Sequence, residues 1–176
     1  VQGMARGMDE VGRKYEAGEY FLSELIVAGD AMKKGTEVLR PYLNREKNRN
    51  VARVVLGTVK GDLHDIGKNI AISLLESSGF EVYDLGVDVP AETFLQKIRE
   101  TDAAIIGMSS LLTTTMNEMK NVISALKRSS LRKKVKVIVG GAPITEEFAH
   151  RIGADAYARD AVQGTRICKS WIQSTE

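Results

Sequence analysis

The spacing of hydrophobic residues changes character about a quarter of the way along the chain. In the first part they recur at three- and four-residue intervals, which predicts amphipathic helices on both sides of a turn at residues 16–19. The apolar positions of this helical hairpin are Met4, Met8, Val11, Tyr15, Leu22, Leu25, Ile26, Met32, Leu39 and Leu43. The wholly polar run 44–50 predicts a linker. We therefore place a helical segment at residues 1–46, expect it to be only part of a bundle, and place a second domain at 51–176.

After the linker, short apolar runs alternate with amphipathic segments. We expect strands at residues 51–58, 80–85, 103–108, 135–139 and 154–158, and helices at 68–77, 92–99, 116–128 and 162–172. Continuous apolar strands that alternate with helices predict a parallel sheet covered on both faces. The predicted fold class is therefore α/β, a doubly wound sheet of five parallel strands of the Rossmann or flavodoxin type, preceded by the helical-bundle segment.

Composition narrows the classes of partner. Of the 176 residues 43% are hydrophobic, and the net charge of +2 is close to balance, which argues against nucleic acid and against an anionic membrane. No apolar run is long enough to span a bilayer. The single cysteine, Cys168, has no partner for an internal disulfide, which fits a reducing compartment. We expect a cytoplasmic protein.

Polar and glycine residues follow four of the predicted strands. Because ligands bind beyond the carboxyl ends of the strands in an open parallel sheet, these loops define the candidate site. They span residues 60–67, 86–90, 109–115 and 140–145. One loop offers an imidazole, one a row of hydroxyl groups and one a pair of glycines, so the site could ligate, hydrogen-bond and closely approach a bulky ligand.

Several familiar sites do not match. The segment 61–69 has five residues rather than four between its glycines, and Asn69 stands where a phosphate-binding loop needs Ser or Thr. The first loop has no three-glycine dinucleotide pattern. One cysteine and two histidines do not make a convincing structural zinc site, and the chain has no Gly-x-Ser-x-Gly nucleophile elbow.

The remaining motif is Asp62-x-His64-x-x-Gly67. A metal-bound imidazole is usually oriented by a carboxylate on its other nitrogen, which fixes the tautomer and raises the basicity of the ligand. Asp62 is close enough in sequence to do this, and Gly67 is expected to keep the turn sterically open. Taken alone, the motif also fits a plain loop histidine with Asp62 as a helix cap.

The motif does not stand alone. With Ser109-x-Leu111 and Gly140-Gly141 it resembles the three-part signature of cobalamin-binding domains, over residues 52–171. The stretch 59–70 resembles the methyl-transfer branch, which includes cobalamin-dependent methionine synthase and the corrinoid proteins of methanogens and acetogens. Residues 8–12 and 15–22 are similar to the helical cap of that family. The cofactor implied is cobalamin or a related corrinoid.

The resemblance assigns roles to individual residues. It implies that His64 displaces the cofactor's own dimethylbenzimidazole base and binds cobalt from below, with Asp62 behind it and the hydroxyl of Thr115 further back. The nucleotide tail would then enter a slot in the sheet domain. Its expected lining residues are Ser109, Leu111, Thr113, Gly140, Gly141, Ala142 and Tyr157. From the hairpin, Tyr15, Leu22 and Leu25 are expected to face the upper side of the corrin, and Phe21 is expected to be core.

The implied function is that of a methyl carrier. One methyltransferase would load a methyl group onto cobalt(I) from an amine, methanol or an aryl ether, and a second would pass it to a thiol or a tetrahydropterin. A reductive activase is a further expected partner, and neither catalytic site would lie in this chain. Three alternatives stay open: a subunit of an adenosylcobalamin mutase, a cobalamin-based sensor, and a flavodoxin-like domain without cobalt.

Overall fold

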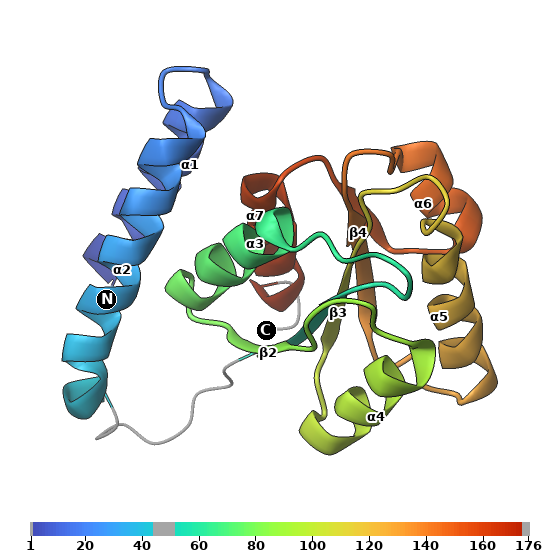
Figure 1. The fold of residues 1–176 in the computed structure, drawn as a ribbon. Helices are drawn as coiled ribbons and strands as arrows, with labels where there is room; N and C mark the ends of the chain where they lie inside the picture. The colour runs from blue at the N-terminus through green and yellow to red at the C-terminus, as the bar shows by residue number, and fades with distance from the viewer. Residues whose placement is uncertain (1, 44–51, 174–176) are drawn as a thin grey trace.

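A helical hairpin lies beside a three-layer α/β domain (Figure 1). The computed structural model describes residues 2–43 and 52–173. The hairpin consists of α1 (Gln2–Glu16) and α2 (Leu22–Leu43), with Gly18 in a left-handed conformation in the turn. The predicted hairpin is therefore confirmed, whereas the predicted linker at residues 44–50 lies outside the described residues.

The sheet has five parallel strands in the order β2-β1-β3-β4-β5. They are β1 (Arg53–Thr58), β2 (Glu81–Asp84), β3 (Ile105–Ser109), β4 (Lys136–Gly140) and β5 (Ala156–Ala158). Every predicted strand is present, with ends within two residues of the prediction. The chain reverses its direction of winding between β1 and β3, and this switch point is where an open sheet of this type binds ligands.

Helices cover both faces of the sheet (Figure 1). On one face lie α3 (Ile66–Ser77) and α7 (Ala161–Gln173), and on the other lie α4 (Ala91–Thr101), α5 (Asn117–Arg128) and α6 (Glu146–Ile152). The start of α6 is set by Thr145, whose hydroxyl oxygen accepts a hydrogen bond from the Phe148 amide at 3.1 Å. Within the described ranges, no helix combines the length and the apolar character needed to cross a membrane.

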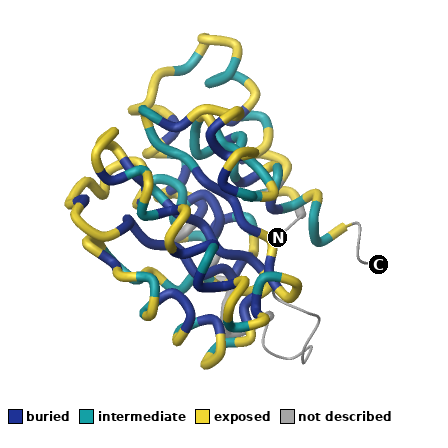
Figure 2. The backbone as a smooth tube through the Cα atoms, turned by 90° about the vertical axis from the view of Figure 1, so that its right-hand side faces the viewer, coloured by how far each residue is buried: buried dark blue, intermediate teal, exposed yellow. Residues whose placement is uncertain are grey.

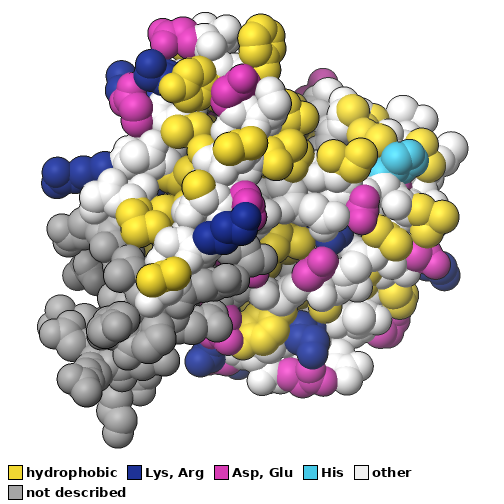
Figure 3. Space-filling view, turned by 60° about the vertical axis from the view of Figure 1, so that its left-hand side comes forward, with side chains coloured by type: hydrophobic (Ala, Val, Ile, Leu, Met, Phe, Trp, Pro, Cys, Tyr) yellow, Lys and Arg dark blue, Asp and Glu magenta, His cyan; other side chains and the backbone are white. Residues whose placement is uncertain are grey.

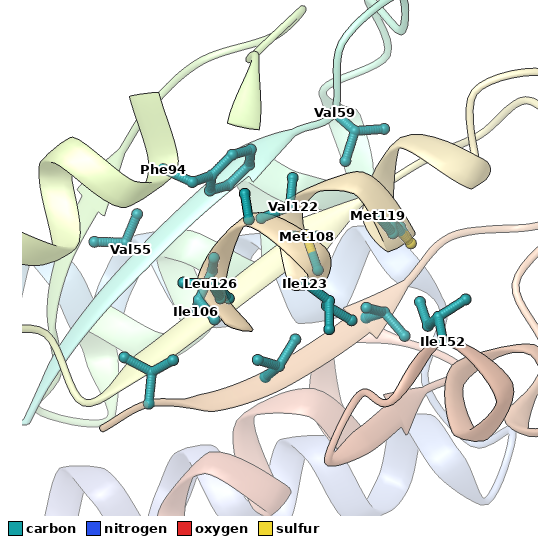
Figure 4. Packing of buried hydrophobic residues seen from close by; sticks show 14 of the residues in the cluster. Val55, Val59, Phe94, Ile106, Met108, Met119, Val122, Ile123, Leu126 and Ile152 are labelled. Atoms are coloured by element: carbon teal, nitrogen blue, oxygen red, sulfur yellow. The ribbon is translucent and has the colours of Figure 1, made fainter. Parts of the chain in front are cut away.

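The strands alternate between two hydrophobic cores because successive side chains of a strand point to opposite faces. Val55 and Ile106 pack with Phe94 beneath α4 and α5, as Figure 4 shows, whereas Val54 and Ile105 pack beneath α3 and α7. The buried backbone runs through the centre of the molecule (Figure 2). The edge from which the candidate loops leave is thus held between two packed layers.

The hairpin is attached to the α3/α7 face by a small core and by ion pairs. Met8, Leu25 and Met32 pack with residues of α3 and α7. Around them Lys169 Nζ lies 2.7 Å from Asp9 Oδ1, and an Arg166 nitrogen lies 2.7 Å from a Glu16 carboxylate oxygen.

Other hydrophobic side chains remain exposed along the hairpin (Figure 3), and they include Phe21, Leu22, Ile26 and Val27. The prediction that Phe21 is a core residue is wrong, because its side chain is 74% exposed. Helical periodicity does not locate Phe21, which stands immediately before α2 rather than on a face of it.

Two phenylalanines give a matched test of the core. Phe94 is fully buried, whereas Phe21 is 74% exposed. We expect Phe94→Ala to lower the free energy of unfolding by about 3–5 kcal/mol, because it removes buried apolar surface and leaves a cavity. Phe21→Ala is expected to change it by less than about 0.5 kcal/mol. Urea unfolding of both variants measures the difference, and equal effects would contradict the packing described above.

Candidate cofactor-binding site at the carboxyl edge of the sheet

The centre of the site is a histidine held by a buried carboxylate. His64 Nδ1 lies 2.7 Å from Asp62 Oδ1, and the His64 amide donates to the same oxygen at 3.1 Å. A carboxylate only accepts hydrogen bonds, so the proton of this pair sits on Nδ1 and the Nε2 lone pair is available to a metal. The His64 side chain is 51% exposed, whereas that of Asp62 is 0% exposed. The structure thus brings the two residues together in the geometry that the sequence predicts.

The second oxygen of Asp62 is anchored by the loop after β3. Oδ2 accepts hydrogen bonds from the Leu111 amide at 2.7 Å, the Leu112 amide at 3.2 Å and the Thr115 hydroxyl at 2.9 Å. Burial raises the pKa of Asp62, but hydrogen bonds from His64 and from this loop outweigh it and hold that pKa well below its usual value. The carboxylate is therefore an anion that cannot rotate away from the imidazole.

Ser110, which is not among the residues predicted from the sequence, belongs to the same network. Its hydroxyl is buried, donates to Asp62 Oδ2 at 3.2 Å and lies 2.8 Å from the Thr115 hydroxyl. Strand alternation offered the signal: Ser109 is the last residue of β3 and faces the opposite way from its neighbour. Two hydroxyl groups rather than one therefore stand behind Asp62.

A cavity of about 580 Å³ opens beside His64. It runs between the carboxyl ends of the strands and the helices α3 and α7, with mainly apolar walls. Five of the predicted slot residues line it, together with Asp65, Ile66, Gly67 and Lys68 from the start of α3. The five are Ser109, Leu111, Gly140, Gly141 and Ala142.

The glycines of the site serve different purposes. At Gly141, with a φ of 128°, a Cβ atom would collide with the carbonyl oxygen of Ser110, and at Gly140 it would come within 2.9 Å of the Ala158 carbonyl oxygen. Both glycines are therefore already required by the protein's own backbone, not only by a ligand. Gly67 differs from the prediction: it lies in the first turn of α3 rather than in a turn of the loop, and a Cβ there would meet nothing within 4 Å.

Several predicted site residues lie elsewhere. Thr113 is exposed in the turn after β3 and does not line the cavity. The prediction for Tyr157 is wrong, because its side chain packs in the core beneath α5 and α6, on the opposite face of the sheet. Ala158, its neighbour in β5, points to the cavity instead. The short strand gave too few residues for the alternation to be assigned from sequence.

The three hairpin residues do not line this cavity either. Tyr15 is half-buried against the hairpin core and Leu22 is 41% exposed. Leu25 corrects the prediction: it is 2% exposed and packs against Leu74 and Val162 in the core between hairpin and domain. The helical spacing of Leu25 predicted that its side chain is buried, but it did not indicate whether that side chain packs against the protein or against a ligand.

Lys68 and Cys168, which were not among the predicted site residues, also line the cavity. Lys68 is almost fully buried and its Nζ lies 2.7 Å from Asp84 Oδ1, which ties the start of α3 to the end of β2. Cys168 is buried as well, and this burial raises the pKa of its thiol to about 12. It is therefore a packing residue, and His150 is an exposed residue of α6.

These observations fit a corrinoid. One imidazole fills one coordination position, which suits a metal whose other positions are occupied by a macrocycle. Leu63 and Ile66, both 72% exposed, line the cavity with His64 and present apolar surface that would suit the flat face of such a ring. The adjoining cavity is of the size of small-molecule sites in proteins and has room beside Gly67 for an extended tail.

Comparisons with known proteins point to the same class of cofactor. Models of the B12 binding domain match residues 52–165 and residues 1–40. Dimethylamine corrinoid protein 3 of Methanosarcina acetivorans is 45% identical over 168 residues, which cover 96% of this chain and 79% of the relative. A cobalamin-binding protein of Desulfitobacterium hafniense superimposes with a TM-score of 0.86 at 41% identity, over 97% of this chain and 80% of that chain.

A third similar structure is the methanol:cobalamin methyltransferase complex of Methanosarcina barkeri, with a TM-score of 0.82 and 32% identity over 97% of this chain and 65% of that chain. The fold, the imidazole at the mouth of the cavity and the matched residues all lead to the same assignment. The chain belongs to the family of B12 binding domains, whose cofactor is cobalamin or a related corrinoid.

Proposed function

We propose that this chain carries a methyl group between two methyltransferases on the cobalt of a bound corrinoid, with His64 as the lower axial ligand. The observation that carries the proposal is the Asp62–His64 pair at the mouth of the cavity, with Nε2 left available. The names of the relatives support the carrier role, since the dimethylamine protein is a corrinoid protein and the methanol complex is a cobalamin methyltransferase.

The bound corrinoid would supply cobalt chemistry that is intrinsic to the cofactor. The protein's part is to hold and orient. Asp62 would keep the imidazole in the Nδ1-protonated tautomer and direct Nε2 outward. Thr115 and Ser110 would hold the Asp62 carboxylate in place behind the imidazole. The cavity beside Gly67 would take the nucleotide tail, so that the cofactor's own base is removed from the metal.

The proposed partners follow from the carrier role. The relatives' names favour a methyltransferase specific for a methylated amine as the donor partner. An acceptor methyltransferase that uses a thiol or a tetrahydropterin, and a reductive activase, complete the proposed set. Tyr15 and Leu22 would face the upper side of the corrin from the hairpin, and a cytoplasmic location fits the reduced Cys168.

The two histidines of the chain provide a direct test of the axial ligand. Protein reconstituted with hydroxocobalamin is expected to show the absorption spectrum of imidazole-coordinated cobalt. We expect His64→Ala to lose that spectrum, because the described lining of the cavity contains no second imidazole. His150→Ala, which changes an exposed residue of α6, is the matched control and is expected to keep it.

An unchanged spectrum in His64→Ala would rule out the proposed ligand. Methyl transfer then separates the remaining alternatives. Methylation of the reduced wild-type protein by an amine-specific methyltransferase supports the carrier, whereas a mutase subunit or a sensor would bind the cofactor without accepting a methyl group from that enzyme.

Gly67 tests the cavity independently of the cobalt ligand. Gly67→Ala is expected to stabilise the cofactor-free protein by up to about 1 kcal/mol, because alanine favours the helix and meets no neighbour. Gly67→Leu would place a larger side chain in the proposed tail slot and is expected to weaken hydroxocobalamin binding by about tenfold or more. Thermal unfolding and cofactor titration measure the two effects. Undiminished affinity in Gly67→Leu would show that the tail does not pass Gly67.

A further inference from the structure

The loop that carries His64 is hydrogen-bonded to the loop after β2. Two backbone hydrogen bonds join the loops on either side of Asp88: the Thr58 amide donates to the Gly86 carbonyl at 3.0 Å, and the Val89 amide donates to the Thr58 carbonyl at 3.0 Å. A parallel bridge between Val59 and Val89 extends the sheet beyond the end of β1. The two loops therefore form one paired unit under the imidazole.

Asp88 lies at the centre of this unit and contacts both residues that precede Leu63. Its carboxylate Oδ1 accepts a hydrogen bond from the Gly61 amide at 2.6 Å, and its own amide donates to the Asp62 carbonyl at 2.9 Å. The hydrogen bond to Oδ1 has an ionised acceptor, which makes it stronger than a neutral one. Asp88 thus holds the backbone of Asp62, the residue whose carboxylate orients His64.

The backbone conformation of Asp88 is unusual. Its φ is 55°, in the left-handed region that few residues other than glycine adopt. Only Asp102 and Ser130 share this property among the non-glycine residues that the structure describes. Such a conformation costs energy and persists only where its surroundings hold it, often at functional sites. Here it aims both the amide and the carboxylate of Asp88 at the same neighbouring loop.

Asp62 cannot be displaced far without the loss of its hydrogen bonds. Its side chain receives hydrogen bonds from His64 on one oxygen and from the loop after β3 on the other. A shift of the Asp62 backbone would misalign both sets and rotate the imidazole. From the other side, the Thr58 hydroxyl donates to the His64 carbonyl at 2.9 Å, so the loop is fixed before and after the ligand.

We propose that Asp88 is a positioning residue for the cofactor ligand: it fixes the backbone of Gly61 and Asp62 and thereby sets the direction of the His64 imidazole. This role rests on the proposed function of His64 as cobalt ligand. Asp88 makes no contact with the imidazole in the structure, and its side chain is exposed rather than part of a core. Its effect therefore passes through the loop.

Three substitutions separate the parts of this role. Asp88→Asn keeps an oxygen acceptor and tolerates the left-handed conformation, so it is the conservative variant. Asp88→Gly also tolerates the conformation but lacks the acceptor for Gly61, so it isolates the side-chain hydrogen bond. Asp102→Gly is the matched control, because Asp102 has a φ of 51° but lies after α4, at the opposite edge of the sheet.

The experiment has one readout without cofactor and one with it. In the cofactor-free protein, amide hydrogen exchange at Gly61, followed by NMR, reports on the loop alone. We expect Asp88→Gly to speed this exchange by roughly tenfold, while Asp88→Asn and Asp102→Gly stay near the wild type. In the reconstituted protein, we expect Asp88→Gly to weaken hydroxocobalamin binding by about tenfold and to lower the imidazole-coordinated fraction, and Asp88→Asn to restore both.

Wild-type exchange and full imidazole coordination in Asp88→Gly would overturn the inference. Equal losses in Asp88→Gly and Asp102→Gly would also overturn it, because they would indicate a general effect on stability. A wild-type protein without imidazole coordination would instead overturn the proposed function. The exchange of the cofactor-free protein distinguishes that case, since it measures the hold of Asp88 on the loop with no cobalt present.

Discussion

The buried carboxylate of Asp62 is the interaction on which the site depends. A lone carboxylate in a protein interior is costly, and it stays ionised here because both oxygens are fully engaged: one by His64, the other by two amides and two hydroxyl groups. The same hydrogen bonds join the loop after β1 to the loop after β3. The same set of hydrogen bonds therefore stabilises the charge of Asp62 and orients the His64 imidazole.

This feature follows from the topology of the sheet. In the order β2-β1-β3-β4-β5, the strands β1 and β3 are neighbours although α3, β2 and α4 separate them in the chain. The loops that follow these two strands can therefore form hydrogen bonds with each other. The glycines at the end of β4 and the helices α3 and α7 line the open cavity beside them. The loop after β2 completes the support through Asp88. Four loops that are distant in sequence thus together form the site around one imidazole.

The strands, most helices and the location of the site were predictable from the sequence. Strand and helix periodicities are local, and ligands of an open parallel sheet bind beyond the carboxyl ends of its strands. The pairing of Asp62 with His64 was predictable from their spacing, whereas the approach of Thr115 was implied by the family resemblance. Contacts that depend on tertiary geometry were not. Strand alternation separates Ser110 from Ser109, but the contact of Ser110 with Asp62 needed the turn after β3, and the position of Tyr157 needed the facing of a three-residue strand. The left-handed conformation of Asp88 has no signal in a single sequence.

The identity of the axial nitrogen is the central claim, and electron paramagnetic resonance tests it most directly. In the cobalt(II) form, the unpaired electron couples to the axial nitrogen nucleus, so natural nitrogen splits each cobalt line into three and nitrogen-15 splits it into two. Protein labelled with nitrogen-15 only in histidine and reconstituted with unlabelled cofactor is predicted to show pairs. Triplets that persist in the labelled sample would assign the nitrogen to the cofactor's own base and would contradict the account.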